Sequence, residues 1–457
     1  MSQDQENKGS TRREFIRNAA LTATVSVAAS QIAKSSVYSL APAKVLGAND
    51  KIIIGHVGTG MQGTTHVRLL HDNATDGLKN NTEQVAVCDL YVRRRKEAAA
   101  ILGLNDSGIF ADHRKLLENK DIDAVWVTTS DQWHADVALD AMEAGKHVYI
   151  EKPMCKTVEQ AYKLYDTAKK TKRVVQVGVQ GTSTPIYHNC ANLIKNGQYG
   201  TRVMGQASYC RNSKEGEWNF YPIDPGTGPQ ATGDNYIDWN TFRRGTKPVE
   251  WVPDRFFRWR KWWDYGTGLV GDLLPHRLYP MMIALNIPQD DFQGFPTRVA
   301  SCGGLYVQKY NAQGKVDRHV PDFVDVITDF EGGPSLMLMT TCINEEGWTD
   351  TVRMNKATIT LGGDTIMVKP ERVWADEIDG TEVSSPSEDR IDVHERNFLD
   401  AIRGVVPEPN CNIDLGLRGQ IILSLAVLSY RNNAEMNFDP KTRKYWPGSH
   451  INPATII

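Results

Sequence analysis

The chain has 457 residues, of which 40% are hydrophobic and 23% charged, with a formal net charge of −3 and a mean hydropathy of −0.42. This composition is typical of a soluble globular protein, and the length suggests two or three domains. The charge balance offers no basic face for nucleic acid. Seven scattered cysteines without a CxxC pair argue against both a zinc site and a disulfide framework, so no metal is expected.

Residues 1–43 have the pattern of a twin-arginine export signal. Arg12 and Arg13 precede Phe15 and Ile16, and a short, weakly apolar stretch with small residues follows. The stretch is too short and too polar for a stable membrane span, and the alternative is a disordered arm or a poor first helix. We therefore expect export through the twin-arginine machinery to a periplasmic or secreted location, with a linker over 44–49.

The first chemical motif joins an apolar strand, Ile52–Val57, to a glycine-rich turn and a helical pattern. In G-x-G-x-x-G the first glycine permits the tight turn, the second lets the backbone approach a pyrophosphate, and the third allows close helix–strand packing. The N-terminus of the following helix faces the anion, so this context predicts a dinucleotide site. The residues predicted to bind the cofactor here are Gly58, Thr59, Gly60, Met61 and Gly63.

The second apolar strand, QVAVCDL, ends at Asp89. A carboxylate at this position accepts hydrogen bonds from both ribose hydroxyls of NAD and repels a 2′-phosphate, which favours NAD. The arginines at 93–95 follow at once and offer a site for the phosphate of NADP; the alternative for them is a solvated helix face. NAD is the expected cofactor, and NADP stays open.

Apolar strands and helical patterns then alternate through residue 179. Strand patterns cover Ala124–Thr128, 147–150 and 174–179, and helical patterns cover 134–144 and 157–170. This alternation with short links predicts a parallel sheet with helices on both faces, an NAD(P)-binding Rossmann domain over 50–179. Ser130 and His134, in TTSDQWH after a strand, are further predicted cofactor contacts.

The tripeptide Glu151-Lys152-Pro153 stands at the carboxyl end of the strand HVYI. Ligands lie outside the carboxyl ends of strands in open parallel sheets, so Lys152 is expected beside the nicotinamide. Pro153 would fix the turn, and Glu151 would contact the cofactor site and help to place Lys152. The alternative is an ordinary charged turn before a helix.

These motifs together resemble the glucose–fructose oxidoreductase, inositol dehydrogenase and rhizopine-catabolism (Gfo/Idh/MocA) family. The resemblance rests on strand–GxGxxG–helix, TTSDQWH and AGKHVYIEKPMCKT, and it is closest to a secreted, twin-arginine branch. It implies NAD(P)-dependent chemistry on sugars, cyclitols and their derivatives, and a second domain with an open, mainly antiparallel sheet. Short β-rich runs and two closing helical patterns agree with an α+β domain over 180–457, through whose sheet we expect a homo-oligomer.

The second chemical motif is GDLLPHRLYP, in which Asp272 and His276 are spaced i, i+4 and would share one helical face. The resemblance implies that they are the family's D-x-x-x-H pair, with Lys152 as the third catalytic residue. His276, whose unperturbed pKa is near neutrality, would take the hydroxyl proton. Lys152 would stabilise the alkoxide, and burial would lower the pKa of the lysine. Asp272 would hold Lys152 and His276 in place and tune them electrostatically.

The alternative for this motif is a helix with Asp272 as N-cap and a buried His276 that only packs. The sequence also departs from the family pattern, which has a small residue where Pro275 stands. Pro280 would free the carbonyl group of His276 and kink the helix.

An aromatic loop over 211–268 holds six of the 11 tryptophans, interleaved with arginines. Such a loop can build stacking faces for sugar rings, or it can form an oligomer or domain interface, where Trp and Arg are also enriched. The predicted substrate contacts are Arg258, Trp263 and Tyr265.

Export and a nucleotide motif in one chain have a consequence for function. The periplasm holds no pool of free nicotinamide nucleotide, so we expect the cofactor to be loaded before export, held tightly and recycled in place. Three hypotheses follow: an oxidoreductase that transfers hydride to or from a secondary hydroxyl of a sugar, cyclitol or glycoside; a redox-neutral NAD-dependent glycosidase or lyase; and a non-catalytic NAD-bound sugar sensor, against which the intact motifs argue.

Overall fold

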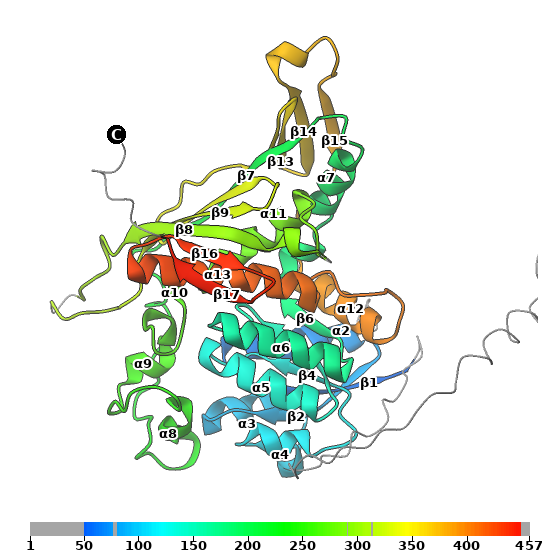
Figure 1. Cartoon of the computed structure of the whole chain (residues 1–457). Coiled ribbons are helices and arrows are strands. Elements are labelled where there is room, and N and C mark those ends of the chain that lie inside the picture. The colour runs from blue at the N-terminus through cyan, green and yellow to red at the C-terminus, as the bar shows by residue number, and fades with distance from the viewer. Residues whose placement is uncertain (1–49, 76–79, 290, 312–313, 449–457) are drawn as a thin grey trace, which may run out of the picture. The chain divides into compact units, whose positions relative to one another are not determined.

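The structure is a computed structural model that describes residues 50–75, 80–289, 291–311 and 314–448. The predicted signal peptide over 1–43 and the linker over 44–49 lie outside the described residues. Within the described part, the strands form two sheets, each covered by helices (Figure 1).

The first sheet has six parallel strands in the order β3-β2-β1-β4-β5-β6, which confirms the predicted α/β fold. The carboxyl ends of the parallel strands meet at one edge, where the cofactor is expected. Its strands are β1 (Ile52–Val57), β2 (Thr82–Cys88), β3 (Ile109–Phe110), β4 (Ala124–Val127), β5 (His147–Glu151) and β6 (Val175–Gly178). The helices among them are α2 (Met61–Thr75), α3 (Val92–Leu102), α4 (His113–Leu117), α5 (Asp131–Glu143) and α6 (Val158–Thr171).

Helices cover both faces of this sheet, because successive strand residues point to opposite sides. In β4, Val125 and Val127 pack in the cluster that includes α5 and α6. Trp126 packs in the other cluster, with α2 and with α12 (Ile391–Ile402), whose Phe398 lies 5.3 Å from the Trp126 ring. The Rossmann core therefore includes a helix from the region predicted as the second domain.

The second sheet has eleven strands, ten of them in the order β15-β14-β13-β12-β7-β10-β9-β8-β16-β17, with β11 beside β7. The β7–β10 pair is parallel and the other pairs are antiparallel, which confirms the mainly antiparallel sheet. Its strands are β7 (Arg202–Asn212), β8 (Pro296–Gly304), β9 (Phe323–Phe330), β10 (Ser335–Thr341), β11 (Ile343–Asn344), β12 (Asp350–Met354), β13 (Ala357–Gly362), β14 (Thr365–Pro370), β15 (Thr381–Ser384), β16 (Met436–Asp439) and β17 (Lys444–Pro447). The remaining helices are α7 (Pro185–Lys195), α8 (Trp239–Phe242), α9 (Pro253–Phe257), α10 (Gly268–Asp272), α11 (Pro275–Ala284) and α13 (Ile413–Asn432).

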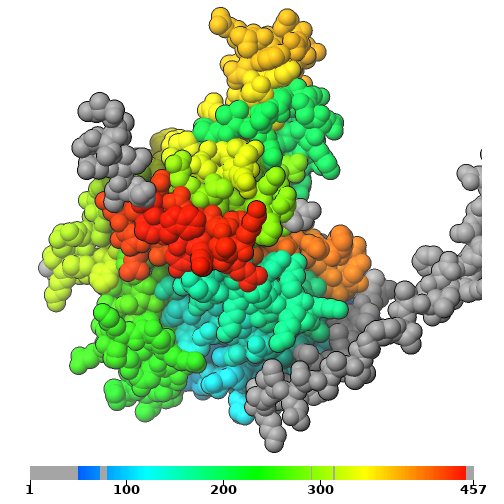
Figure 2. All heavy atoms as spheres, in the orientation of Figure 1, coloured from blue at the N-terminus to red at the C-terminus, as the bar shows by residue number. Residues whose placement is uncertain are grey.

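Helix α13 joins the two sheets. By length and composition it is apolar enough to cross a membrane, but 83% of that stretch is buried inside the protein, as in a core helix. It contacts both α6 and β8, and Figure 2 shows the red C-terminal atoms lying against the teal atoms of α6. The Arg443–Asp166 ion pair at 2.6 Å adds a further contact between this end of the chain and α6.

Candidate active site

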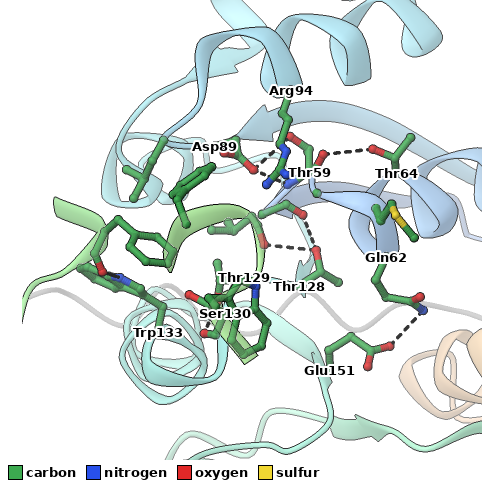
Figure 3. A pocket seen from close by; sticks show the side chains of 18 of the residues that line it. Thr59, Gln62, Thr64, Asp89, Arg94, Thr128, Thr129, Ser130, Trp133 and Glu151 are labelled. Atoms are coloured by element: carbon green, nitrogen blue, oxygen red, sulfur yellow. Dashed lines mark hydrogen bonds between the residues drawn. The ribbon is translucent and has the colours of Figure 1, made fainter. Parts of the chain in front are cut away.

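A cavity of about 1020 Å³ runs along the carboxyl edge of the first sheet, from the glycine turn to the junction of α10 and α11. Figure 3 shows the part of it around Thr59, Asp89 and Glu151. It is lined by both domains, and its size suits a dinucleotide with a small substrate. The predicted site residues that line it are Gly58, Thr59, Gly60, Met61, Asp89, Ser130, Glu151, Lys152, Asp272 and His276.

The glycine turn has the geometry that its motif predicts. Gly58 has a φ of +91°, and a Cβ there would come within 2.7 Å of the Thr128 carbonyl group. A Cβ on Gly63 would collide with the carbonyl oxygen of Gly58. The nearest atom to a Cβ on Gly60 is Arg94 Nη1, at 3.5 Å, so the backbone there stays open to a ligand. The turn therefore leaves room for a pyrophosphate, and Gly63 lies behind it as a packing position.

Asp89 closes the ribose end of the cavity. Its Oδ2 accepts from the backbone N–H of Thr59 at 2.7 Å and its Oδ1 from that of Tyr91 at 2.8 Å, which fixes the carboxylate at the end of β2 (Figure 3). Oxygen lone pairs beyond these two bonds remain for ribose hydroxyls. These residues fit NAD, the cofactor of this Rossmann fold.

The three arginines after Asp89 are not a solvated helix face. The Arg94 guanidinium lies 5.4 to 5.6 Å from the ring centres of Tyr91, Phe256 and Phe257, and Arg95 donates to the Asp89 carbonyl oxygen at 2.8 Å. Arg93, within 3.6 Å of Asp224, lines the cavity with Arg94. The aromatic loop folds back over α3 and supplies these partners, a tertiary contact that helical spacing does not show.

Lys152 and Asp272 form the centre of the substrate end. Lys152 Nζ donates to Asp272 Oδ1 at 3.0 Å and to the Asp272 backbone oxygen at 2.6 Å. Arg260 Nε also donates to Oδ1, at 3.1 Å, and the indole of buried Trp218 donates to Oδ2 at 2.8 Å. Burial opposes the charge of Asp272, but Lys152 and Arg260 outweigh it and hold the pKa of that carboxyl well below its usual range.

The structure corrects two expectations about His276. Asp272 ends α10 while His276 lies in α11, because Pro275 has no N–H to continue the helix; α11 then runs through Pro280 to Ala284. Asp272 therefore holds Lys152, and no hydrogen bond joins it to His276 among the described residues. Burial, and then the charge of Lys152, lower the pKa of His276 to about 3, so the ring is neutral near pH 7.

The imidazole of His276 is available to a ligand. Its ring stacks on Tyr209, with ring centres 5.0 Å apart, and its nitrogens have no hydrogen-bond partner within the described ranges. Its backbone oxygen, which Pro280 leaves without a helical donor, lies 3.5 Å from Arg277 Nη1. A neutral, positioned imidazole facing a cavity can accept a proton.

Glu151 is held by a buried ion-pair relay. Its Oε1 lies 2.9 Å from His66 Nε2, and His66 Nδ1 lies 2.7 Å from Glu395 on α12. Burial disfavours the imidazolium, but the two carboxylates outweigh it and raise the pKa of His66 to about 9. Glu151 Oε2 accepts from the Lys152 backbone N–H at 3.0 Å, so the relay positions the turn that carries Lys152.

Five predicted contacts lie outside the cavity lining, and one of them is Gly63, behind the glycine turn. His134 is buried, with Nδ1 2.6 Å from the Pro153 carbonyl oxygen and Nε2 3.0 Å from that of Thr129, so it supports the turn from behind. Arg258 donates to the backbone oxygens of residues 219 and 221. Trp263 packs toward Tyr430 on α13, at 6.2 Å. Tyr265 is fully buried in the core of the aromatic loop.

The aromatic loop is chiefly a core of its own. Trp239 and Trp262 pack with the aromatic residues of α8 and α9 and with Tyr91, beside the cofactor end of the first sheet. Of the six loop tryptophans, all within the described part of the chain, Trp259 lines the cavity. Among the lining residues that the sequence interpretation missed, five come from β7 and the aromatic loop: Tyr209, Arg211, Tyr221, Trp259 and Arg260. Tyr209 is the last residue of VMGQASY (203–209), one of the short β-rich runs of the sequence, and it lies within β7.

Buried histidines make the stability of the protein depend on pH. Burial lowers the pKa of His56 and His276 to about 3 and that of His147 and His394 to about 4. Between about pH 6.5 and 4 these four histidines bind more protons in the unfolded chain than in the folded one, so their contribution to the free energy of unfolding falls as the pH falls.

We expect the melting temperature to drop between pH 7 and pH 5, as followed by circular dichroism. His56→Gln should reduce this pH dependence, because the glutamine does not titrate. The matched variant His71→Gln replaces an exposed histidine and should leave the pH dependence of the melting temperature unchanged. Equal pH dependence in all three proteins would contradict this account.

Comparison with known proteins agrees with the cofactor geometry. Residues 52–179 match the family described as "Oxidoreductase family, NAD-binding Rossmann fold". "Glycosyl hydrolase family 109 protein 1" of Shewanella sp. (strain ANA-3) is 28% identical over 255 residues, 51% of this chain and 51% of that protein. The "Glycosyl hydrolase family 109 protein" of Shewanella pealeana (strain ATCC 700345 / ANG-SQ1) is 28% identical over 318 residues, 65% and 61% of the two chains. The chain spans about half the length of the first of these relatives.

Solved structures share the fold. Levoglucosan dehydrogenase, in complex with NADH and levoglucosan, superposes with a TM-score of 0.62 at 18% identity, over 84% of this chain and 99% of that one. An oxidoreductase domain protein from Kribbella flavida superposes with a TM-score of 0.63 at 18% identity, over 84% and 98% of the two chains. Both domains of the described region thus have counterparts in a single known architecture.

Proposed function

We propose that this chain, which carries the NAD-binding domain of the Gfo/Idh/MocA oxidoreductase family, transfers hydride between a tightly held nicotinamide cofactor and a secondary hydroxyl of a carbohydrate. The observation that supports this most directly is the neutral imidazole of His276 in the same cavity as the Lys152–Asp272 pair. The proposed base, the lysine ammonium group and the glycine turn all line one cavity, as a hydride transfer coupled to proton removal requires.

Each residue has a defined part in this reaction. When bound, the nicotinamide ring takes up or returns the hydride of the carbinol carbon. His276 accepts the hydroxyl proton on its unpartnered ring nitrogen. The Lys152 ammonium, held by two oxygens of Asp272, donates a hydrogen bond to the developing alkoxide and lowers its energy. Asp272 acts as the positioning residue of Lys152.

A redox-neutral glycosidase or lyase is the second candidate, and the names of the curated relatives favour it. In that reaction the same transient oxidation acidifies the neighbouring C–H bond, elimination breaks the glycosidic bond, and water addition and reduction follow. Lys152 and His276 would keep their parts in the redox steps. The two candidates differ in the net products and not in the residues of the first step.

The location of the protein bears on the cofactor. We propose export through the twin-arginine route with NAD already bound, on the basis of Arg12 and Arg13 in the N-terminal pattern. Detection of the mature protein, with its nucleotide, in a periplasmic or culture-medium fraction tests this. A protein found only in the cytoplasm would overturn it.

The second sheet offers a face for self-association. Ile327 on β9, Met337 on β10 and Met367 on β14 lie in one row of register across the sheet, and Ile327 and Met367 are exposed. Between Met337 and Met367 the same row holds the polar residues Gln206, Thr351 and Thr360. We propose that this mixed face, with the exposed apolar side chains of Ile327 and Met367, is a contact of a homo-oligomer. Light scattering of the purified protein tests this proposal, and a monomer would overturn it.

The proposed reaction predicts a spectroscopic change in the purified protein. Adding the correct sugar or glycoside to protein that retains its nucleotide should produce the absorbance of reduced nicotinamide, at up to about one equivalent per subunit. The nucleotide released on denaturation identifies the cofactor. A broad panel of sugars, cyclitols and glycosides that changes neither this absorbance nor the amount of free sugar would favour the sensor.

A further inference from the structure

Arg260 presents hydrogen-bond donors that the protein does not use. Its Nε donates to Asp272 at 3.1 Å, while Nη1 and Nη2 have no partner within the described residues. The guanidinium lies 4.3 Å from the ring centre of Trp259 and 5.6 Å from that of Tyr221, and 23% of the side chain is exposed. The two rings restrict the orientation of the guanidinium. Because Arg260 lines the cavity, its two unpartnered nitrogens can donate hydrogen bonds to a ligand there.

A second arginine lines the same end of the cavity. Arg211 Nη2 donates to the Tyr209 hydroxyl at 2.9 Å, and Nη1 lies 3.4 Å from Glu217, whose pKa is raised by burial. Its Nε has no hydrogen-bond partner among the described residues. Because Tyr209 stacks on His276, Arg211 stands near the proposed base.

Three carboxylates near these arginines accept hydrogen bonds from other groups of the protein. Asp272 accepts from Lys152, Arg260 and Trp218. Glu151 accepts from His66 and from the Lys152 backbone. Asp131 accepts from the N–H and the hydroxyl of Thr267. Glu217, whose side chain is 3% exposed, accepts from Arg211 Nη1 at 3.4 Å. Nη1 and Nη2 of Arg260 and Nε of Arg211 have no partner among the described residues, so positively charged donors remain for a ligand at this end of the cavity.

We propose that the substrate is an anionic sugar, a uronic acid residue whose carboxylate is bound by Arg260 and Arg211. A planar guanidinium fork matches a carboxylate in two parallel hydrogen bonds. Two guanidinium groups with unused donors favour a negatively charged group of the substrate over a neutral hydroxyl, because charge-assisted hydrogen bonds are the stronger ones. This inference rests on the proposed function for the identity of the site, and it names the substrate class.

Substrate charge would also act on the base. Lys152 and Arg211 both lower the pKa of His276. A bound carboxylate would partly offset these two positive charges, and would make the ring a stronger proton acceptor when the substrate is in place. A neutral sugar in the same pose would lack this effect.

The test is calorimetric titration of the nucleotide-loaded protein with methyl glycosides in matched pairs. Each pair consists of a uronide and its neutral hexoside, in the gluco, galacto and manno series, with the methyl uronamides as uncharged isosteres. At least one uronide should bind about tenfold or more tightly than its hexoside and its amide, since hydrogen bonds to charged groups contribute about 1.5 to 3 kcal/mol.

Substitutions test which residue causes the preference for the uronide. Arg260→Gln should remove most of the preference for the uronide, and Arg260→Lys should restore it only in part, because lysine keeps the charge and loses the fork. Arg372→Gln, at an exposed position, is the matched control and should retain the preference. Arg211→Gln replaces Arg260→Gln if the latter loses its nucleotide, since Arg211 is 42% exposed.

The outcomes separate this inference from the proposed function. If no uronide binds more tightly than its neutral partners, or if only sulfated sugars do, the uronic acid assignment is overturned. If neutral sugars reduce the bound nicotinamide as well as uronides, the inference fails and the oxidoreductase stands. If a uronide binds through Arg260 and no sugar changes the nicotinamide absorbance, the inference stands and the oxidoreductase fails.

Discussion

Replacing Lys152 with alanine is expected to lower turnover by at least about a hundredfold, the low end for the loss of a positioned donor to a developing negative charge. The ammonium stands 3.0 Å from the Asp272 carboxylate and supplies the positive charge for the developing alkoxide. Arg260 and Trp218 still bond Asp272 in the variant, so that buried carboxylate keeps partners and the fold should persist. The measurements are kcat from nicotinamide absorbance and the nucleotide released per subunit.

Controls separate chemistry from structure. Lys163→Ala, at an exposed position on α6, should leave both quantities unchanged. His276→Ala should cause a loss of similar size to Lys152→Ala, because it removes the unpartnered acceptor. Normal cofactor content with near-normal rates in both variants would place the chemistry on other residues.

Sustained turnover without added NAD is the second expected result, and it follows from the proposed preloading of the cofactor. A nucleotide that cannot leave must return to its starting redox state in every cycle. Protein purified with its own nucleotide should therefore complete many cycles, whereas a simple dehydrogenase would stop after about one turnover per subunit. The measurement is product formed per subunit in buffer free of nucleotide.

The products tell which net reaction occurs. Free sugar released from a single glycoside would favour the redox-neutral glycosidase. Turnover only in the presence of a second carbonyl compound would favour a two-substrate oxidoreductase. A strict requirement for added NAD, with rapid exchange of the bound nucleotide, would refute preloading.

Local patterns in the sequence were enough to predict the cofactor half of the site. Strand alternation and helical spacing depend on neighbours a few residues apart, so they predicted β1, β2, β4, β5 and β6 and the helices α2, α5 and α6. They did not predict the short elements β3 and α4. The glycines of the turn were predictable for the same reason, because steric limits on Gly58 and Gly63 come from the strand–turn–helix unit itself. Lys152 could be placed because it directly follows β5.

The substrate half depended on contacts between distant segments. Arg258, Trp263 and Tyr265 have the same residue types and lie in the same loop as the lining residues Trp259 and Arg260. Which of them faces the cavity is decided by how the loop packs over α3 and against α13, and neither periodicity nor composition reports that packing.

The electrostatic state of the site likewise came from the assembled structure. The near-neutral pKa expected of His276 belongs to a solvated imidazole, and burial beside Lys152 lowers it to about 3. Glu151 is oriented by His66 from α2 and, through it, by Glu395 from α12, 244 positions further along the chain. Burial and charge at a residue are sums over everything that surrounds it in space, and most of those neighbours are remote in sequence.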